Sequence, residues 1–362
     1  MLHRHRVLVP ILTAAALLSA ACGGESGSAG DTGAARSSGS VDLTGAGATF
    51  PYPLYSKWFA DYANQTGVRI NYQSIGSGGG IRQLSEQTVD FGATDSPMTD
   101  EELARAKGGP ILHIPTVLGA VVIAYNLPEV TQPIKLTGPV LADIYRGQIT
   151  KWNDPRIAQL NAGVTLPPTD VLVVHRSDGS GTTYIFSDYL AAVSPEWAAA
   201  PGRGKELKWP VGLGAKGNEG VSAQVKQLPG AIGYTELAYA RQNQLPVASI
   251  QNKSGNFVAP NAESVTAAAA GAMGKLGADS DYRISVVNAD GANAYPISSF
   301  TWLIVYQNQP DQVKGQKLED FLKWALTAGQ QSAAALDYAP LPPELARQLA
   351  GRVENLAGGT TP

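Results

Sequence analysis

An apolar run that ends in a turn rich in glycine and hydroxyl groups most constrains how this chain can fold. Val171–Val174 is bounded by Pro-Pro and Asp-Gly pairs, which is typical of a buried strand. An amphipathic stretch begins at Thr183, so Asp178-Gly-Ser-Gly-Thr182 joins a strand to a helix. The first turn of a helix offers unpaired amides and the positive end of the dipole, and Arg176 adds a guanidinium. The segment predicts a site for a small tetrahedral oxyanion; an ordinary capped turn is the alternative.

Three further segments repeat this pattern of a strand, small residues and a helix start. Thr44-Gly-Ala-Gly-Ala-Thr-Phe50 precedes a helix predicted from Pro51, which Thr49 has the side chain to cap. Ser74-Ile-Gly-Ser-Gly-Gly-Gly80 places the Ser77 hydroxyl at the next helix start. Val89–Thr94 then leads into Asp95, for which capping of the following acid-rich helix is the structural alternative. Repetition of this arrangement favours a shared anion site over unrelated turns.

Strand-like and helix-like segments alternate along the chain, which predicts an α/β fold with ligands at the carboxyl ends of strands. The predicted strands are Leu43, Val68–Tyr72, Asp90–Thr94, Ile111–Pro115, Val121–Tyr125, Val171–Arg176, Ile232–Tyr234 and Ser298–Tyr306. The predicted helices include Val140–Tyr145, Thr183–Ala192, Ser222–Gln227, Gln312–Leu326 and Pro343–Leu356. The six tryptophans are expected to pack in cores or interfaces.

Length and composition limit the class of protein. A chain of 362 residues is long enough for two lobes. The formal net charge of −3 gives no basic face, so nucleic acid is not an expected partner. A single cysteine excludes internal disulfides and any multi-cysteine metal site.

The N-terminal sequence is typical of a targeting signal. A basic start, His3-Arg4-His5-Arg6, precedes an apolar core too short to span a bilayer. Residues 1–22 end in Leu18-Ser-Ala-Ala-Cys22, which resembles a bacterial lipoprotein signal with Cys22 as the lipidated residue, although Ser19 stands where leucine is commoner. An ordinary cleaved signal peptide with a chance cysteine is the alternative. Residues 23–41, rich in Gly, Ser and Ala, are expected to form a flexible tether.

Many separated motifs occur in one order between about Leu43 and Leu349. They are Thr44-Gly-Ala-Gly-Ala-Thr-Phe-Pro51, Val89-Asp-Phe-Gly-Ala-Thr-Asp95, Asp178-Gly-Ser-Gly-Thr182, Lys208-Trp-Pro-Val-Gly-Leu-Gly214, Gly217-Asn218, Pro229-Gly-Ala-Ile-Gly-Tyr234 and Leu336-Asp-Tyr-Ala339. In these motifs the chain resembles the phosphate-binding proteins of the bacterial phosphate-specific ABC importer. The resemblance implies a two-lobed, hinged periplasmic-binding-protein fold that holds dehydrated inorganic phosphate in the cleft between its lobes.

The resemblance also implies the residues that contact phosphate. Carried over by matching motif, they are Thr49, Phe50, Ser77, Asp95, Arg176, Ser180, Gly181 and Thr182, with Asp178 paired to Arg176. Lobe I would comprise 42–118 and 297–356, and lobe II 119–296. The partners would be an importer's permease subunits and its ATPase, with the protein anchored by lipid to the outer face of the cell membrane. Gly78 and His175 depart from the usual family residues without removing an expected contact.

An acidic residue in an anion site is explained by counting protons. Phosphate near neutral pH carries at least one proton, whereas sulfate carries none. An ionised Asp95 accepts hydrogen bonds only, so it can bind a P–OH group but opposes the lone pairs of sulfate. This contrast argues against the nearest alternative, the same scaffold tuned to sulfate or molybdate.

Two further alternatives belong to other classes. A phosphate-handling hydrolase needs a nucleophile with a base, or a metal cluster. Only His113 and His175 lie outside the signal, and no His-x-x-x-His pair or Gly-x-Ser-x-Gly elbow is present. A binding protein with no catalytic residues, metal or cofactor is therefore expected. A lipoprotein that keeps the fold for adhesion or signalling without a ligand is the last alternative.

Overall fold

The computed structural model describes residues 42–275, 281–354 and 356. The predicted signal peptide, its Cys22 and the tether lie outside the described residues. Among the described residues no helix is both long enough and apolar enough to span a membrane.

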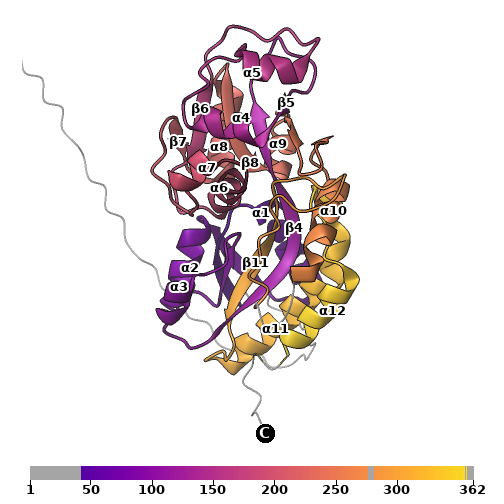
Figure 1. The fold of residues 1–362 in the computed structure, drawn as a ribbon. Coiled ribbons are helices and arrows are strands. Elements are labelled where there is room, and N and C mark those ends of the chain that lie inside the picture. The colour runs from indigo at the N-terminus through magenta and orange to yellow at the C-terminus, as the bar shows by residue number, and fades with distance from the viewer. Residues whose placement is uncertain (1–41, 276–280, 355, 357–362) are drawn as a thin grey trace, which may run out of the picture. The chain divides into compact units, whose positions relative to one another are not determined.

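The described chain is built on one mixed sheet of eight strands in the order β2-β1-β3-β11-β4-β8-β6-β7 (Figure 1). Its strands are β1 Leu43–Gly47, β2 Ile70–Ser74, β3 Phe91–Thr94, β4 Ile111–Tyr125, β6 Leu172–Arg176, β7 Leu213–Ala215, β8 Ala231–Glu236 and β11 Ser298–Tyr306. A small sheet joins β10 Phe257–Val258, β9 Ser249–Gln251 and β5 Lys135–Leu136. The predicted α/β class is confirmed.

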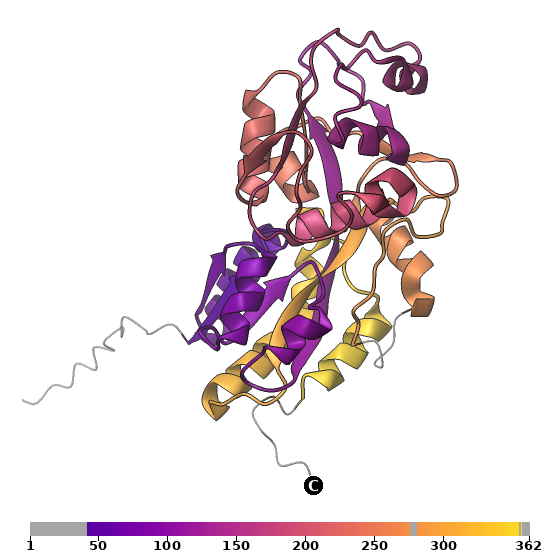
Figure 2. The same ribbon diagram turned by 60° about the vertical axis from the view of Figure 1, so that its left-hand side comes forward.

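Helices cover both parts of this sheet (Figures 1 and 2). They are α1 Tyr52–Thr66, α2 Ser77–Ser85, α3 Asp100–Ala104, α4 Gly138–Tyr145, α5 Pro155–Ala158, α6 Gly181–Val193, α7 Pro195–Ala199, α8 Gly217–Gln227, α9 Leu237–Gln242, α10 Ala262–Ala272, α11 Gln312–Leu326 and α12 Pro343–Arg352. The prediction for α11 was correct at both ends. Helix α8 begins five residues before the predicted Ser222, and α12 ends before the predicted Leu356.

Strand β4 is the element that connects the two parts of the sheet. Nine of its first ten residues, all except Thr116, pair with β11, and Val121–Tyr125 pair with β8. The sequence was predicted to form two separate strands here, Ile111–Pro115 and Val121–Tyr125, whereas the structure has one continuous strand. The structure accommodates Pro115 opposite Trp302, where the register with β11 shifts, so the missing amide hydrogen falls at an irregular position of the ladder.

The fold is the two-lobed periplasmic-binding-protein fold. The β1 lobe is defined here by β1, β2, β3, β11 and the first part of β4, and the β6 lobe by β6, β7, β8 and the second part of β4. Strands β2 and β3 run parallel to β1, and β7 and β8 run parallel to β6. Each lobe therefore gathers the carboxyl ends of three strands at one edge, where ligands of α/β proteins bind.

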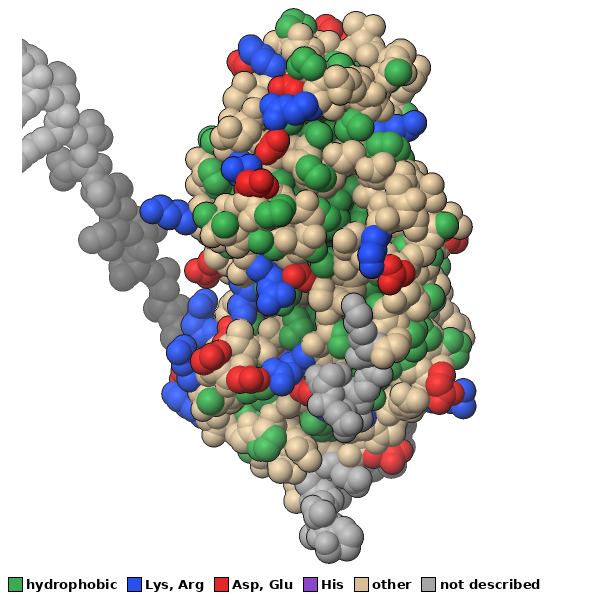
Figure 3. All heavy atoms as spheres, viewed as in Figure 1, with side chains coloured by type: hydrophobic (Ala, Val, Ile, Leu, Met, Phe, Trp, Pro, Cys, Tyr) green, Lys and Arg blue, Asp and Glu red, His purple; other side chains and the backbone are tan. Residues whose placement is uncertain are grey.

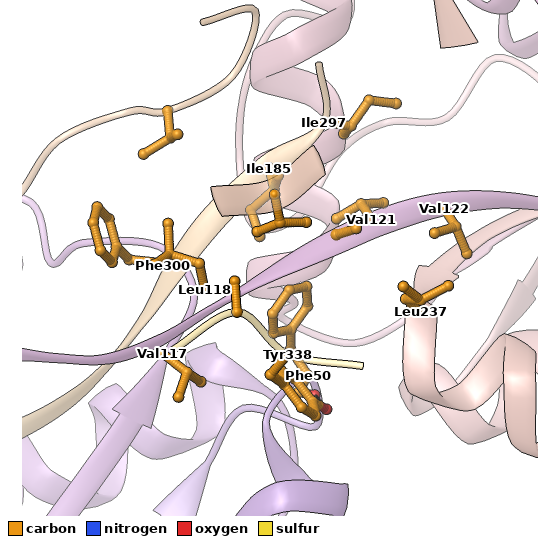
Figure 4. Close-up of a cluster of buried hydrophobic side chains, with 14 of the residues drawn as sticks. Phe50, Val117, Leu118, Val121, Val122, Ile185, Leu237, Ile297, Phe300 and Tyr338 are labelled. Atoms are coloured by element: carbon orange, nitrogen blue, oxygen red, sulfur yellow. Dashed lines mark hydrogen bonds between the residues drawn. The ribbon is translucent and has the colours of Figure 1, made fainter. Parts of the chain in front are cut away.

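Hydrophobic packing holds the crossing strands beneath these edges. Figure 4 shows Val117, Leu118 and Val121 of β4 near Phe50, which precedes α1, and Tyr338, which follows α11. All five side chains are buried in one continuous core. Trp58, Trp152, Trp197 and Trp302 are fully buried, in agreement with the predicted packing role of the tryptophans. The site edges therefore rest on rigid, close-packed elements.

Candidate functional site

Three predicted site residues lie just beyond the carboxyl ends of strands in the β1 lobe. Thr49 follows β1, Ser77 follows β2 and Asp95 follows β3. The strand ends are in register, with Gly47 opposite both Ser74 and Ala93. All three side chains are at most 2% exposed. Parallel pairing therefore brings residues from three distant turns to one buried edge.

The turn before α1 leaves polar groups of Thr49 and Phe50 available. The N-cap of α1 is Pro51, without a side-chain cap, so the capping role considered for Thr49 was wrong. The Thr49 hydroxyl instead accepts a hydrogen bond from Asn218 Nδ2 at 2.7 Å. The Phe50 ring packs 6.4 Å from the Tyr338 ring, and the Tyr338 hydroxyl donates to the Phe50 carbonyl at 2.7 Å. None of the described residues accepts a hydrogen bond from the Phe50 amide.

Asp95 is a buried acid held in a fixed orientation. Its Oδ1 accepts from the Thr301 hydroxyl at 2.8 Å, and its amide donates to Ser77 Oγ at 3.2 Å. Burial raises the pKa of Asp95 to about 7, against the opposite effects of the Thr301 hydroxyl and the Arg176 charge. Thr99 caps α3 in a capping box with Glu102, so the alternative that Asp95 caps this helix was wrong. The Asp95 carboxylate is therefore not used to cap helix α3.

In the β6 lobe, Arg176 at the end of β6 forms a bidentate ion pair with Asp178. Nε and Nη2 donate to the two carboxylate oxygens at 2.7 and 2.6 Å. Although burial opposes it, this pairing keeps the pKa of Asp178 below its ordinary value. Nη1 donates to Thr182 Oγ1 at 3.3 Å. Of the five N–H groups of a guanidinium, two remain for a ligand among the described contacts.

The start of α6 presents the remaining predicted residues. Ser180 is the N-cap, and its hydroxyl accepts from the Thr183 amide at 3.0 Å, which leaves the hydroxyl proton to donate elsewhere. The Gly181 amide and the Thr182 side chain follow in the first turn, and both residues are buried. The end of β6 and the start of α6 therefore offer a guanidinium, two hydroxyl groups and a helix N-terminus to one place.

Contacts across the cleft join the two sets of residues. The Gly181 amide donates to Ser77 Oγ at 3.1 Å, and the Gly78 amide donates to the Gly179 carbonyl at 2.9 Å. A Cβ at position 181 would lie 2.5 Å from both Asp95 Oδ2 and Ser77 Oγ, so only glycine allows this approach. The lobes are therefore closed on each other at the site.

An ion pair lies at the edge of this contact. Lys205 Nζ, in the loop after α7, is 2.7 Å from Glu102 of α3. Figure 3 shows basic and acidic side chains side by side over this face of the molecule. The pair connects the β6 lobe with the β1 lobe outside the buried site.

Several residues with direct roles in the network were not predicted as site residues. Asn218 of α8 bridges Thr49 and Thr182 through hydrogen bonds of 2.7 and 3.1 Å. The Tyr239 hydroxyl donates to the Thr49 carbonyl at 2.6 Å. The Tyr234 hydroxyl accepts from the Arg176 amide at 3.0 Å. Only the motifs Gly217-Asn218 and Pro229–Tyr234 signalled two of these positions.

Neither histidine outside the signal contacts the site hydroxyls. The His113 ring is buried between Asp281 Oδ2, 2.7 Å away, and the Met98 amide at 3.1 Å. The His175 ring stacks on Trp209 at 4.8 Å between centroids. Among the described residues, no group of three or more His, Cys, Asp or Glu side chains is arranged to hold a metal ion. Both histidines have structural partners.

Comparisons with known proteins show the family to which the chain belongs. The model of the PBP superfamily domain matches residues 30–328. The phosphate-binding protein PstS of Pasteurella multocida is 47% identical over 308 residues, which cover 85% of this chain and 88% of that protein. PstS of Xylella fastidiosa (strain Temecula1) is 46% identical over 86% of this chain and 84% of its own length.

A solved structure shows the same fold. The high-affinity periplasmic phosphate-binding protein PfluDING, solved with bound phosphate, superposes with a TM-score of 0.68 at 24% identity, covering 86% of this chain and 93% of that chain. This likeness concerns the fold, whereas the sequence identities define the closer relationship. The chain therefore belongs to the PBP superfamily and, within it, to the family of the phosphate-binding proteins PstS.

Proposed function

We propose that this protein captures inorganic phosphate outside the cytoplasm and delivers it to an ABC importer. The observation that carries the proposal is the buried carboxyl group of Asp95, which lies against the Ser77 hydroxyl of its own lobe and against Gly181 of the other lobe. Donors alone would bind any tetrahedral oxyanion. One acceptor in a dry site selects an anion that still carries a proton, because sulfate would leave the acceptor facing lone pairs.

Each predicted residue has a role in this proposal. The Thr49 hydroxyl, the Phe50 amide and the Ser77 hydroxyl donate from the β1 lobe, and Asp95 accepts the phosphate proton. Arg176, the Ser180 and Thr182 hydroxyls and the Gly181 amide donate from the β6 lobe. Asp178 orients the guanidinium through its bidentate pair and moderates its field. In this structure the Gly181 amide donates to Ser77, so phosphate would replace that contact.

Closure of the two lobes on the anion would signal the loaded state. A ligand that contacts both lobes stabilises the closed form by its differential affinity. We place lobe I at 42–118 and 297–356 and lobe II at 119–296. The change of β4 partner between Ala120 and Val121, and the start of β11 at Ser298, support hinge positions near these boundaries.

Binding without catalysis and attachment to a membrane complete the proposal. Among the described residues, neither histidine bonds to a hydroxyl group of the site, so the proposal includes no histidine-activated nucleophile. Cys22 would carry the lipid that holds the protein at the outer face of the cell membrane, where the permease subunits lie. Energy for transport would come from the ATPase of the importer.

Calorimetric titration tests the proposal. The purified protein, stripped of bound phosphate, is titrated with phosphate and then with sulfate at pH 8. One-to-one phosphate binding with no sulfate signal is the expected result. Heat from sulfate or molybdate alone would assign a different ligand to the same fold, and no heat from any oxyanion would indicate a protein that has lost its ligand.

A further inference from the structure

Asn218 is a fully buried amide whose orientation is fixed by its surroundings. It lies in the first turn of α8 and is 0% exposed. Its Oδ1 accepts from the Glu236 amide at 3.0 Å and from the Thr235 hydroxyl at 3.2 Å. A backbone amide can only donate, so the oxygen must face β8 and the Nδ2 group must face the cleft.

The two protons of this Nδ2 group reach hydroxyls from opposite lobes. One goes to Thr49 Oγ1 at 2.7 Å and the other to Thr182 Oγ1 at 3.1 Å. Thr49 Oγ1 accepts a second bond from the Asn218 amide at 3.3 Å, and Thr182 Oγ1 accepts a second from Arg176 Nη1 at 3.3 Å. A hydroxyl has one proton and two lone pairs. Both lone pairs of each threonine are therefore occupied, and each hydroxyl can only donate to a further partner.

We infer that Asn218 is a positioning residue that makes the Thr49 and Thr182 hydroxyls donors only and directs their protons to the bound phosphate. This inference rests on the proposed function. Because neither hydroxyl can accept the proton of the anion, both favour an orientation in which this proton is donated to Asp95. Asn218 thereby helps to set the orientation of the phosphate and the selection for a protonated anion, although in the proposed scheme it contacts neither the phosphate nor Asp95.

The isosteric variant Asn218→Asp tests this role. A carboxylate offers no proton, so both hydroxyls turn their protons toward it and present lone pairs to phosphate. We expect phosphate affinity to fall by about 100-fold or more at pH 8, since hydrogen bonds to a charged ligand are lost in a buried site. The loss should shrink toward pH 5, as the new carboxyl gains a proton and can donate again. The titratable groups near position 218 are Arg176, Asp178, Lys216, Glu219 and Glu236, all present in the wild-type protein.

Two comparisons separate positioning from a merely structural role. Asn218→Leu removes the donors without adding charge, so its loss of about 10-fold should not vary with pH beyond the wild-type trend. Asn161→Asp is the matched control, because Asn161 is also buried, at 4% exposed, and its amide donates to the carbonyls of Lys135 and Ile157, away from the site. It should lower the melting temperature and leave phosphate affinity unchanged.

A double-mutant cycle keeps the inference testable if Asn218→Asp does not fold. The loss from Asn218→Leu should be smaller in a Thr182→Val background, because one hydroxyl it positions is already gone. Additive losses, or phosphate affinity within threefold of wild type in folded Asn218→Asp at pH 8, overturn the inference and leave the proposed function standing. Absence of phosphate binding by the wild-type protein overturns the proposed function and this inference with it.

Discussion

Replacement of Asp95 by asparagine changes the ligand preference in a direction that follows from the structure. The side chain is 1% exposed, and its Oδ1 is held by the Thr301 hydroxyl at 2.8 Å. An asparagine Oδ1 can keep this bond, so Nδ2 would occupy the place of Oδ2 and face the anion with protons. The substitution therefore exchanges an acceptor for a donor with little change of shape.

The substitution changes the binding free energies of phosphate and sulfate in opposite directions. Phosphate loses one hydrogen bond to a charged group, about 1.5–3 kcal/mol, which is roughly 10- to 150-fold in affinity. Sulfate, which has no proton for the carboxylate, no longer leaves a buried acceptor unpaired, and this penalty is about 1–3 kcal/mol or more for a charged group. Most of a discrimination of roughly 10⁴–10⁵-fold should therefore disappear.

Competition calorimetry at pH 8 measures this ratio, with Asp178→Asn as the control that lowers affinity for both anions alike. Because the pKa of Asp95 is about 7, the wild-type carboxyl gains a proton as the pH falls below 7 and can then donate to sulfate. Wild-type sulfate affinity should rise from pH 8 to pH 6, whereas that of Asp95→Asn should not. An Asp95→Asn protein that binds phosphate and still rejects sulfate as the wild type does would refute the reasoning.

Three other perturbations have defined outcomes. Gly181→Ala places a Cβ 2.5 Å from Asp95 Oδ2, so the two lobes cannot close completely. Phosphate affinity should fall by about 100-fold in a titration, and an unchanged affinity would contradict this. Lys205→Gln removes the ion pair with Glu102, in which the Lys205 side chain is 17% exposed and the Glu102 side chain 24% exposed. Phosphate binding should weaken roughly two- to fivefold at low salt, mainly because phosphate dissociates faster in stopped-flow measurements. An unaltered dissociation rate would exclude a role of this ion pair in closure. Burial raises the pKa of Glu236 well above its ordinary value, so the folded protein keeps a proton that the unfolded chain releases above about pH 4.3. The contribution of Glu236 to the free energy of unfolding is then greatest below that pH and falls by about 1.4 kcal/mol per pH unit as the pH rises toward the folded-state pKa. Glu236→Gln should flatten this loss between pH 5 and 7 in urea unfolding, and parallel curves for both proteins would show that Glu236 is not its source.

Local patterns predicted the elements that carry the site. The apolar run before Arg176 and the hydroxyl-rich turn at Ser180 became β6 and the N-cap of α6. These features depend on neighbouring residues, so periodicity and capping rules describe them. The same rules failed at Thr49, where Pro51 already occupies the N-cap position and the hydroxyl has a partner 169 residues away.

Residues that act through distant contacts could not be predicted in this way. Asn218 was marked only by its motif and Tyr239 by no local signal, and both bond to Thr49 in the other lobe. The continuity of β4 through Pro115 likewise depends on β11, which is supplied by residues near the opposite end of the chain. Sequence patterns describe local elements, whereas these features arise only when the lobes close and the strands pair.

A crystal structure of the protein grown with phosphate tests the central claim most directly. We expect one anion between the lobes, with a phosphate oxygen in short hydrogen-bond contact with Asp95 and the Thr49 and Thr182 hydroxyls donating to other oxygens. The claim would be contradicted by an anion bound elsewhere, or by an Asp95 carboxylate that makes no contact with the phosphate in the cleft.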